Sequence, residues 1–181
     1  MKTKTELRNE IKEKIKRLDL AYCENASTLI CSRVMELDEY KKAKTVFCFV
    51  GTKGEPDTRN IIKDALASGK RVGTPLCIDD GIMEVYEIHG FDDLRPGVFG
   101  ILEPKPGLKL MEPDEIDFAV IPCVTCDHNG NRLGHGKGYY DRYLKRADFP
   151  TCMVCLEKLT SSEIPMNRFD KKADRVITDA E

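Results

Sequence analysis

Apolar residues recur in the N-terminal part of the chain at the spacing of amphipathic helices. The first set, separated by Lys and Glu residues, is Leu7, Ile11, Ile15 and Leu18. This spacing places all four side chains on one face of a helix. The same pattern predicts a second helix over residues 25–37.

Short continuous apolar runs follow, and each ends at a residue that interrupts regular structure. Residues 45–50 are ended by Gly51, and residues 116–121 by Pro122, as is typical of strands buried on both faces. Further strands are predicted over residues 71–77, 82–88, 151–156 and 175–178. Helices are predicted from a cap at Asp57 or Thr58 to Gly69, and over 138–146. Residues 90–114 hold four prolines and four glycines and are predicted to form loops.

Strands alternating with helices predict an α/β fold. Without repeats or a Pro/Ser-rich linker, we expect residues 1–181 to form a single three-layer domain, with a mostly parallel central sheet flanked by helices. Ligands of such sheets bind beyond the carboxyl ends of the strands. The loops after Val50 and Ile121 are therefore the expected places for a site.

The charge balance limits the class of partner. The chain has 29 basic and 31 acidic residues, so its net charge of −2 gives no general attraction for nucleic acid or an anionic membrane. No apolar run approaches the roughly 20 residues of a membrane span, and the charged N-terminus does not resemble a signal peptide. We expect a cytoplasmic monomer that acts on a small molecule.

A glycine-rich segment, residues 131–142, carries the most specific chemistry. Its alternating glycines allow backbone N–H groups to converge on an anionic oxygen, and Arg132, Lys137 and His135 add positive charge. It is not a Walker A loop, because no Lys-Ser/Thr follows the second glycine. It is not a dinucleotide fingerprint either, because Tyr139 occupies the third glycine position. The segment predicts phosphate binding, with a tight turn bearing solvated cations as the alternative.

Two acidic residues lie near the predicted strand ends. Asp141 closes the glycine segment and is a candidate Mg²⁺ ligand, or else a partner of the helix dipole. In the segment 54–58, a turn and a helix cap account for Asp57 and Thr58. Glu55 remains as a candidate substrate contact.

Five segments in order resemble the 5-formyltetrahydrofolate cyclo-ligase family. They are Lys4-x-x-x-Arg8, Gly54-Glu55-Pro56-Asp57-Thr58, Phe99-Gly100-Ile101-Leu102-Glu103-Pro104, the signature Arg132-Leu133-Gly134-x-Gly136-x-Gly138-Tyr139-Tyr140-Asp141-Arg142, and the block from Pro165 to Asp170 with Asp174 to Thr178. The resemblance implies ATP- and Mg²⁺-dependent cyclisation of 5-formyltetrahydrofolate to 5,10-methenyltetrahydrofolate. The folate substrate can carry a polyglutamate tail. ADP and phosphate are released after phosphorylation of the formyl oxygen.

The resemblance also assigns residue roles. Catalytic roles fall to Arg132, Lys137 and Tyr140. ATP contacts fall to Lys4, Arg8, Arg132, Leu133, Gly134, His135, Gly136, Lys137, Gly138, Tyr139 and Tyr140. Substrate contacts fall to Val50, Glu55, His135, Gly136, Lys137, Gly138 and Tyr139. Asp141 and Asp170 are expected to hold Mg²⁺.

The sequence departs from the family pattern at three positions. Leu159 stands where relatives usually carry Gln, Phe169 where His usually precedes Asp170, and Cys126 where Phe usually precedes Asp127. The first two departures raise the alternative of a nucleotide- or folate-binding relative that does not turn over.

A second alternative is a zinc-binding module. Cys123, Cys126, Cys152 and Cys155 form two C-x₂-C pairs that resemble a four-thiolate pattern. However, Cys152 and Cys155 lie in a predicted strand, where positions three apart point to opposite faces. Burial as small apolar side chains is the expectation we favour for both pairs.

Overall fold

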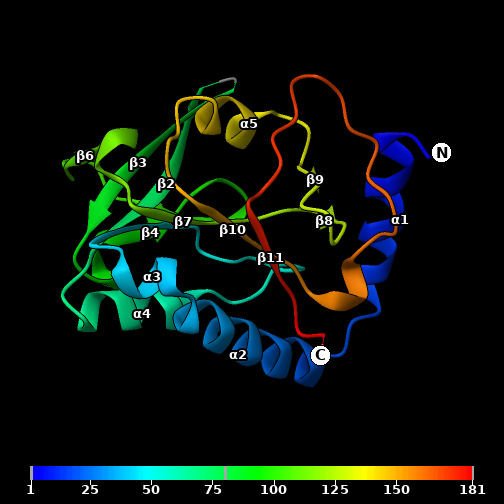
Figure 1. Ribbon diagram of the computed structural model, residues 1–181, viewed down its shortest axis with the longest axis horizontal. Helices are drawn as coiled ribbons and strands as arrows, with labels where there is room; N and C mark the ends of the chain where they lie inside the picture. Colours follow the sequence, from blue (N-terminus) through cyan, green and yellow to red (C-terminus); the bar gives the residue numbers. More distant parts are fainter. Residues whose placement is uncertain (1, 80, 181) are drawn as a thin grey trace.

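A seven-stranded mixed sheet forms the centre of the fold (Figure 1). The computed structural model describes residues 2–79 and 81–180. The strands of the sheet are β1 (Thr45–Cys48), β2 (Arg71–Asp79), β3 (Ile82–Ile88), β6 (Leu110–Met111), β7 (Phe118–Ile121), β10 (Thr151–Val154) and β11 (Arg175–Ile177). Their order is β11-β10-β7-β1-β2-β3-β6, and every pairing is parallel except those of β3 with β2 and with β6.

Helices cover both faces of this sheet. They are α1 (Lys4–Lys16), α2 (Leu20–Glu36), α3 (Asp38–Lys42), α4 (Arg59–Ala67) and α5 (Tyr139–Leu144). Figure 1 shows α2, α3 and α4 on one side of the sheet, α5 on the other, and α1 at one end. The α/β fold and the mostly parallel sheet are therefore confirmed. None of the helices in the described ranges has the length and apolar character that crossing a bilayer requires.

Two aromatic contacts explain why the sheet has a helix layer on each face. Phe118 of β7 is paired in register with Val46, so Phe118 and the next β1 residue, Phe47, point to opposite faces. Tyr40 of α3 packs edge-on against Phe118 at 6.1 Å, while Phe47 contacts Tyr143 of α5 at 5.8 Å. All four residues of β1 are buried, as the continuous apolar run predicts.

Several element boundaries differ from the predicted ones. Helix α2 begins at Leu20 rather than at residue 25, because the Asp19 carboxylate caps it by accepting a hydrogen bond from the Tyr22 amide. Thr58 stands at the N-cap position of α4, but its hydroxyl donates to the Phe49 carbonyl at 2.5 Å instead of capping. The loop predicted over residues 90–114 contains the hairpin β4 (Leu94–Pro96) and β5 (Leu102–Pro104), as well as β6. Helix α5 covers only Tyr139–Leu144, less than the predicted 138–146.

The direction of the strand order reverses at β1. The chain proceeds from β1 to β2 on one side, and later places β7, β10 and β11 on the other. Ligand sites of open α/β sheets lie at such a switch point, beyond the carboxyl ends of the strands. Here that point is formed by the loops that follow β1 and β7.

Candidate active site

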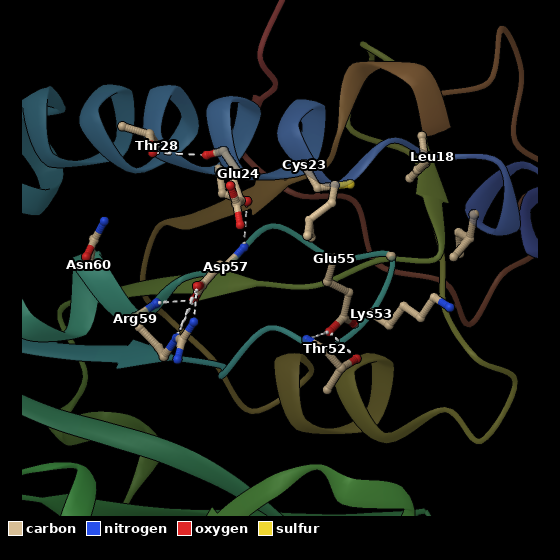
Figure 2. A pocket seen from close by; sticks show the side chains of 14 residues that line it. Leu18, Cys23, Glu24, Thr28, Thr52, Lys53, Glu55, Asp57, Arg59 and Asn60 are labelled. Atoms are coloured by element: carbon tan, nitrogen blue, oxygen red, sulfur yellow. Dashed lines mark hydrogen bonds and ion pairs between the residues drawn. The ribbon is translucent and has the colours of Figure 1, made fainter.

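Two adjoining pockets lie at the switch point. The smaller, of about 230 Å³, is bordered by the loop after β1, the loop after β7, and α1. The larger, of about 620 Å³, lies between the loop after β1 and the start of α2 (Figure 2). Ile15, Lys53, Gly54 and Glu55 line both pockets. The expectation that the loops after Val50 and Ile121 carry a site therefore agrees with the position of these cavities.

Glu55 is held in a fixed orientation between the pockets. Its Oε2 accepts hydrogen bonds of 2.9 Å from both the amide and the hydroxyl of Thr52 (Figure 2). Its side chain is only 11% exposed, and its Oε1 lies 3.7 Å from Nε2 of His135. One carboxylate oxygen thus fixes the loop, while the other points toward the glycine segment. This arrangement suits a carboxylate that contacts a bound molecule.

The glycine segment forms a turn that is bordered by three arginines. Gly136 and Gly138 adopt φ values of +101° and +73°, a region that other residues rarely adopt. A Cβ added at Gly134 would lie 3.3 Å from the nearest Arg132 atom, one at Gly136 would lie 3.4 Å from Arg8, and one at Gly138 would lie 3.0 Å from Arg142. The absence of side chains at the three glycines therefore lets three guanidinium groups approach the backbone of the turn.

Two of these arginines donate to carbonyl oxygens of the turn. Arg8 Nε donates to Gly134 O at 2.8 Å, and Arg142 Nη1 donates to Lys137 O at 2.7 Å. Arg8 belongs to α1, so this contact attaches the N-terminal helix to a turn 126 residues away. Because the bonds end on carbonyl groups, the amide side of the turn keeps its capacity to bind an anion.

Arg132 is buried instead of solvated. Its residue is 5% exposed, and its guanidinium donates to Asp141 Oδ1 at 3.2 Å and to Pro122 O at 3.1 Å. It also lies over the ring of Tyr140, 5.5 Å from its centroid. Arg132 Nε is a buried donor without a partner among the described residues. The alternative of a solvated cation is therefore wrong for Arg132, a residue of β9 (Arg132–Leu133), because Pro122 and the α5 residues Tyr140 and Asp141 contact its guanidinium.

The two expected metal ligands, Asp141 and Asp170, are brought near each other by a backbone hydrogen bond. The amide of Lys171, next to Asp170, donates to Asp141 Oδ1 at 3.1 Å. Asp170 Oδ2 accepts from Lys4 Nζ at 2.5 Å and from the Asn167 amide at 2.7 Å. In the described part of the chain, the bonds found leave Asp141 Oδ2 and Asp170 Oδ1 without a protein partner. Carboxylate oxygens of this kind fit a hard cation such as Mg²⁺.

The two tyrosines after the glycines both pack against the main core and are both partly exposed. The Tyr140 ring stacks on Phe47 with centroids 6.1 Å apart and an interplanar angle of 8°. Burial, reinforced by the charge of Glu55, raises the pKa of Tyr140 well above its usual range. Tyr140 therefore remains protonated at neutral pH, and its neutral hydroxyl and ring can form hydrogen bonds or pack against a ligand. Tyr139 is partly exposed at the start of α5.

Two expected contact residues lie in the interior. Val50 is 7% exposed and belongs to the main core, and Leu133 is 1% exposed in a small cluster with Leu7 and Ile164. Their side chains support the two loops, so any contact they make with a ligand must come from the backbone.

Three basic residues at the site were not anticipated. Lys12 and Lys53 line the smaller pocket, and Arg142 borders Gly138. Lys12 follows Lys4 and Arg8 at intervals of four residues, which places the three side chains along one face of α1. That spacing is visible in the sequence. Arg142 closes the family signature in the sequence, whereas Lys53 carries no comparable signal.

The positions that depart from the family pattern leave the pockets intact. Leu159 is 0% exposed and packs in the main core. Phe169 is 54% exposed, and the cations of Lys145 and Arg168 lie over its ring at 5.1 and 4.6 Å. Neither residue lines either pocket.

The cysteines do not form the four-thiolate set of the zinc alternative. The Sγ atoms of Cys123, Cys126 and Cys155 lie within 4.8 Å of one another, and Cys152 is not part of this group. The four-thiolate zinc pattern is therefore wrong at Cys152, because Cys152 and Cys155 point to opposite faces of the sheet. All eight cysteines are free thiols.

Comparisons with known proteins agree with this geometry. The model of the 5-formyltetrahydrofolate cyclo-ligase family matches residues 1–179. A probable 5-formyltetrahydrofolate cyclo-ligase of Schizosaccharomyces pombe is 33% identical, over 97% of this chain and 94% of its own. The solution structure of Aquifex aeolicus 5,10-methenyltetrahydrofolate synthetase superimposes with a TM-score of 0.86 at 31% identity, covering 98% of this chain and 90% of that one.

A Mycoplasma pneumoniae 5,10-methenyltetrahydrofolate synthetase shares the fold, with a TM-score of 0.81 at 22% identity over 99% of this chain and all of that one. The match of the family model to nearly the whole chain decides the assignment. The chain belongs to the 5-formyltetrahydrofolate cyclo-ligase family, whose reaction is the ATP-dependent conversion of 5-formyltetrahydrofolate to 5,10-methenyltetrahydrofolate.

Proposed function

We propose that the glycine segment binds the ATP phosphates and that the pockets beside Glu55 receive the folate. The observation that carries this proposal is the approach of His135 to Glu55, because it places the anion-binding turn at the edge of the smaller pocket. Lys4, Arg8 and Lys137 supply positive charge on the nucleotide side. The remaining nucleotide contacts come from the backbone of Gly134–Gly138 and from Tyr139 and Tyr140.

Mg²⁺ is the metal that this site is suited to hold. The ligands we assign are Asp141 and Asp170, each of which presents one carboxylate oxygen without a described protein partner. Magnesium usually takes one or two carboxylates together with substrate phosphates. Arg132 then has a positioning role, because its buried guanidinium orients Asp141. When bound, the metal neutralises charge on the nucleotide phosphates.

The chemistry requires activation of an amide-like oxygen. The γ-phosphoryl group passes from ATP to the formyl oxygen, and ADP leaves. The neighbouring secondary amine attacks the formyl carbon and loses its proton, and the C–O bond breaks to release phosphate. Phosphoryl transfer depends on positioning and on stabilisation of charge. Lys137 is the residue we assign to the charge that develops on the transferred group, and Tyr140 is assigned as a neutral neighbour of Glu55.

Glu55 is assigned to the folate side. Its Oε1 faces the pockets, while Oε2 is occupied by Thr52. The polar ring and amide groups of a pterin present N–H donors that suit a fixed carboxylate. Lys12 and Lys53 provide positive charge for the carboxylates of a glutamate tail, whatever its length.

The experiment is incubation of the purified protein with ATP, Mg²⁺ and 5-formyltetrahydrofolate while the near-ultraviolet absorbance of the methenyl product is recorded. Product is expected only when ATP and the divalent metal are both present. An unchanged rate in excess chelator contradicts the metal assignment. Release of ADP without methenyl product contradicts the proposed transfer to the formyl oxygen.

We further propose a monomer in the cytoplasm. The eight free thiols suit a reducing compartment.

A further inference from the structure

Three cysteines form a buried group directly behind the smaller pocket. Cys123 follows β7, Cys126 belongs to β8 (Thr125–Cys126), and Cys155 follows β10. They are 5%, 0% and 3% exposed, and their three Sγ atoms lie within 4.8 Å of one another. Neither the phosphate chemistry nor the folate contacts described above involve them.

The register of the sheet explains how the group forms. Strands β7 and β10 are parallel neighbours in which Ile121 is paired with Met153. Two residues further along each strand, Cys123 and Cys155 lie side by side on the same face. The Cys123 thiol donates to the Val154 carbonyl at 3.8 Å, consistent with this alignment. The hairpin of β8 and β9 then brings Cys126 back to the same place.

Three converging thiols are a ligand set for a soft metal ion. Zn–S bonds of about 2.3 Å at tetrahedral angles separate the sulfur atoms by about 3.8 Å. The sulfur atoms here lie up to 4.8 Å apart, so side-chain movements of about 1 Å or less bring them to the separation found around zinc. Sulfur ligands select against Mg²⁺ and Ca²⁺, which leaves Zn²⁺ and Cu⁺ among the common ions.

The balance of charge favours the divalent ion. Three thiolates around Zn²⁺ carry a net charge of −1, whereas the same ligands around Cu⁺ carry −2, and burial of net charge is costly. Arg8, Lys12 and Lys53 line the pocket that Cys123 also borders, and these cations offset the remaining negative charge. No fourth His, Cys, Asp or Glu ligand joins the group within residues 2–79 and 81–180. Water from the pocket can complete a tetrahedral site.

We propose that Cys123, Cys126 and Cys155 form a three-thiolate site that binds one Zn²⁺ ion, with its fourth position open to the smaller pocket. Binding releases the thiol protons, so the affinity rises with pH. The ion links the loop after β7, the β8–β9 hairpin and the end of β10, which together form one wall of the pocket. This site is independent of the Mg²⁺ site at Asp141 and Asp170, which has oxygen ligands.

The test uses the full-length protein, reduced and freed of metal with a chelator, and titrated with Co²⁺. Bound Co²⁺ is expected to give intense thiolate-to-metal charge-transfer bands that saturate at one equivalent and disappear when Zn²⁺ is added. Loss of a group that only hydrogen-bonds to a metal ligand already costs about 10–100-fold in metal affinity. Replacement of a ligand, in Cys126→Ser or Cys155→Ser, should therefore weaken Zn²⁺ binding by about a hundredfold or more.

Cys152→Ser is the matched control. Cys152 is as buried as Cys155 and lies in β10, which Cys155 directly follows, but it pairs with Val120 and faces the other side of the sheet. This variant should keep wild-type affinity. An equal loss in Cys152→Ser and Cys155→Ser contradicts the site.

The spectrum of the wild-type protein decides the question even if the serine variants do not fold. Absence of charge-transfer bands from folded, reduced wild-type protein overturns the proposal, and so does binding of Cu⁺ without binding of Zn²⁺ or Co²⁺. Formation of methenyl product is measured separately, so failure of the zinc site is distinguishable from failure of the proposed function.

Discussion

Nε2 of His135 lies 3.7 Å from Oε1 of Glu55, although the two residues belong to loops on different strands. This contact brings the glycine segment and the loop after β1 to the edge of one pocket. In the proposed arrangement, a nucleotide phosphate on the turn and a folate beside Glu55 would therefore lie close enough for phosphoryl transfer between them.

Glu55→Gln tests the folate assignment. Loss of the carboxylate charge should weaken 5-formyltetrahydrofolate binding about tenfold or more, since a charge-assisted hydrogen bond contributes about 1.5–3 kcal/mol. ATP affinity should stay near that of the wild type. Calorimetry with each ligand alone separates the two. Glu13→Gln, an exposed residue of α1 paired with Lys16, is the control and should change neither affinity. Equal losses for ATP and folate in Glu55→Gln would falsify the assignment.

Lys137→Ala and Arg132→Ala should differ in stability, although both should lose turnover. Lys137 is exposed, so its removal should change the free energy of unfolding by about 0.5 kcal/mol or less while the rate falls about a hundredfold. Arg132 is buried with Asp141, and breaking such a pair costs about 3–5 kcal/mol. Denaturant unfolding and turnover of both variants give the comparison. Wild-type stability in Arg132→Ala, or turnover of Lys137→Ala within threefold of the wild type, contradicts these roles.

Gly136→Ala should impair ATP binding more than folding. Its φ of +101° disfavours any side chain, and the new Cβ meets the Arg8 guanidinium. Gly69→Ala is the matched control, because Gly69 has φ of +77° but no atom near the added Cβ. Each variant should lose about 1–2 kcal/mol of stability from backbone strain. Only Gly136→Ala should also weaken ATP binding, and comparable ATP affinity in the two variants speaks against the role of the turn.

The ion pair between Arg71 and Glu87 should make stability depend on pH. Arg71 donates to both carboxylate oxygens of Glu87, at 3.0 and 2.7 Å, and these bonds hold the pKa of Glu87 below its usual range. A lowered pKa in the folded state stabilises the fold above the unfolded value of about 4.3, and the contribution disappears as the pH falls through the folded value.

Glu87→Gln should therefore lower the melting temperature at pH 7 and approach the wild type at pH 3. Glu36→Gln, which changes an exposed carboxylate, is the control and should follow the wild-type curve at both pH values. A constant difference between Glu87→Gln and wild type from pH 7 to pH 3 means that the pair does not titrate in this range.

The strands of the sheet could be predicted because each is a short apolar run with a clear end. The range of β3 is the predicted one, while β1 and β10 each end two residues early, where the chain leaves the sheet to form the site. The start of α2 was missed because its first turn, Leu20-Ala21-Tyr22-Cys23, is apolar throughout and so lacks the alternation of apolar and polar residues that marks an amphipathic helix; the cap at Asp19 determines the start. Helix α5 is short because its buried side chains end at Leu144.

The sequence indicates which residues are candidates for the site, but not how buried they are or which residues they contact. Glu55, the glycines and the carboxylates follow from strand-end position and from the family resemblance. The burial of Arg132 depends on tertiary contacts with Pro122 and Tyr140, which no local pattern encodes. The three-cysteine group required the register of β7 against β10, because sequence spacing alone also admitted Cys152.

The bond between Lys4 and Asp170 spans 166 positions of the chain and has a consequence for biosynthesis. Nearly the whole polypeptide must leave the ribosome before the first turn of α1 can meet its partner. The strands after β1 and the helices beneath them can pack earlier, because their contacts are closer in sequence. The side of the fold proposed to bind the nucleotide therefore closes late in synthesis, as does the pairing of β11 with β10, whereas the central strands can pack before Asp170 is made.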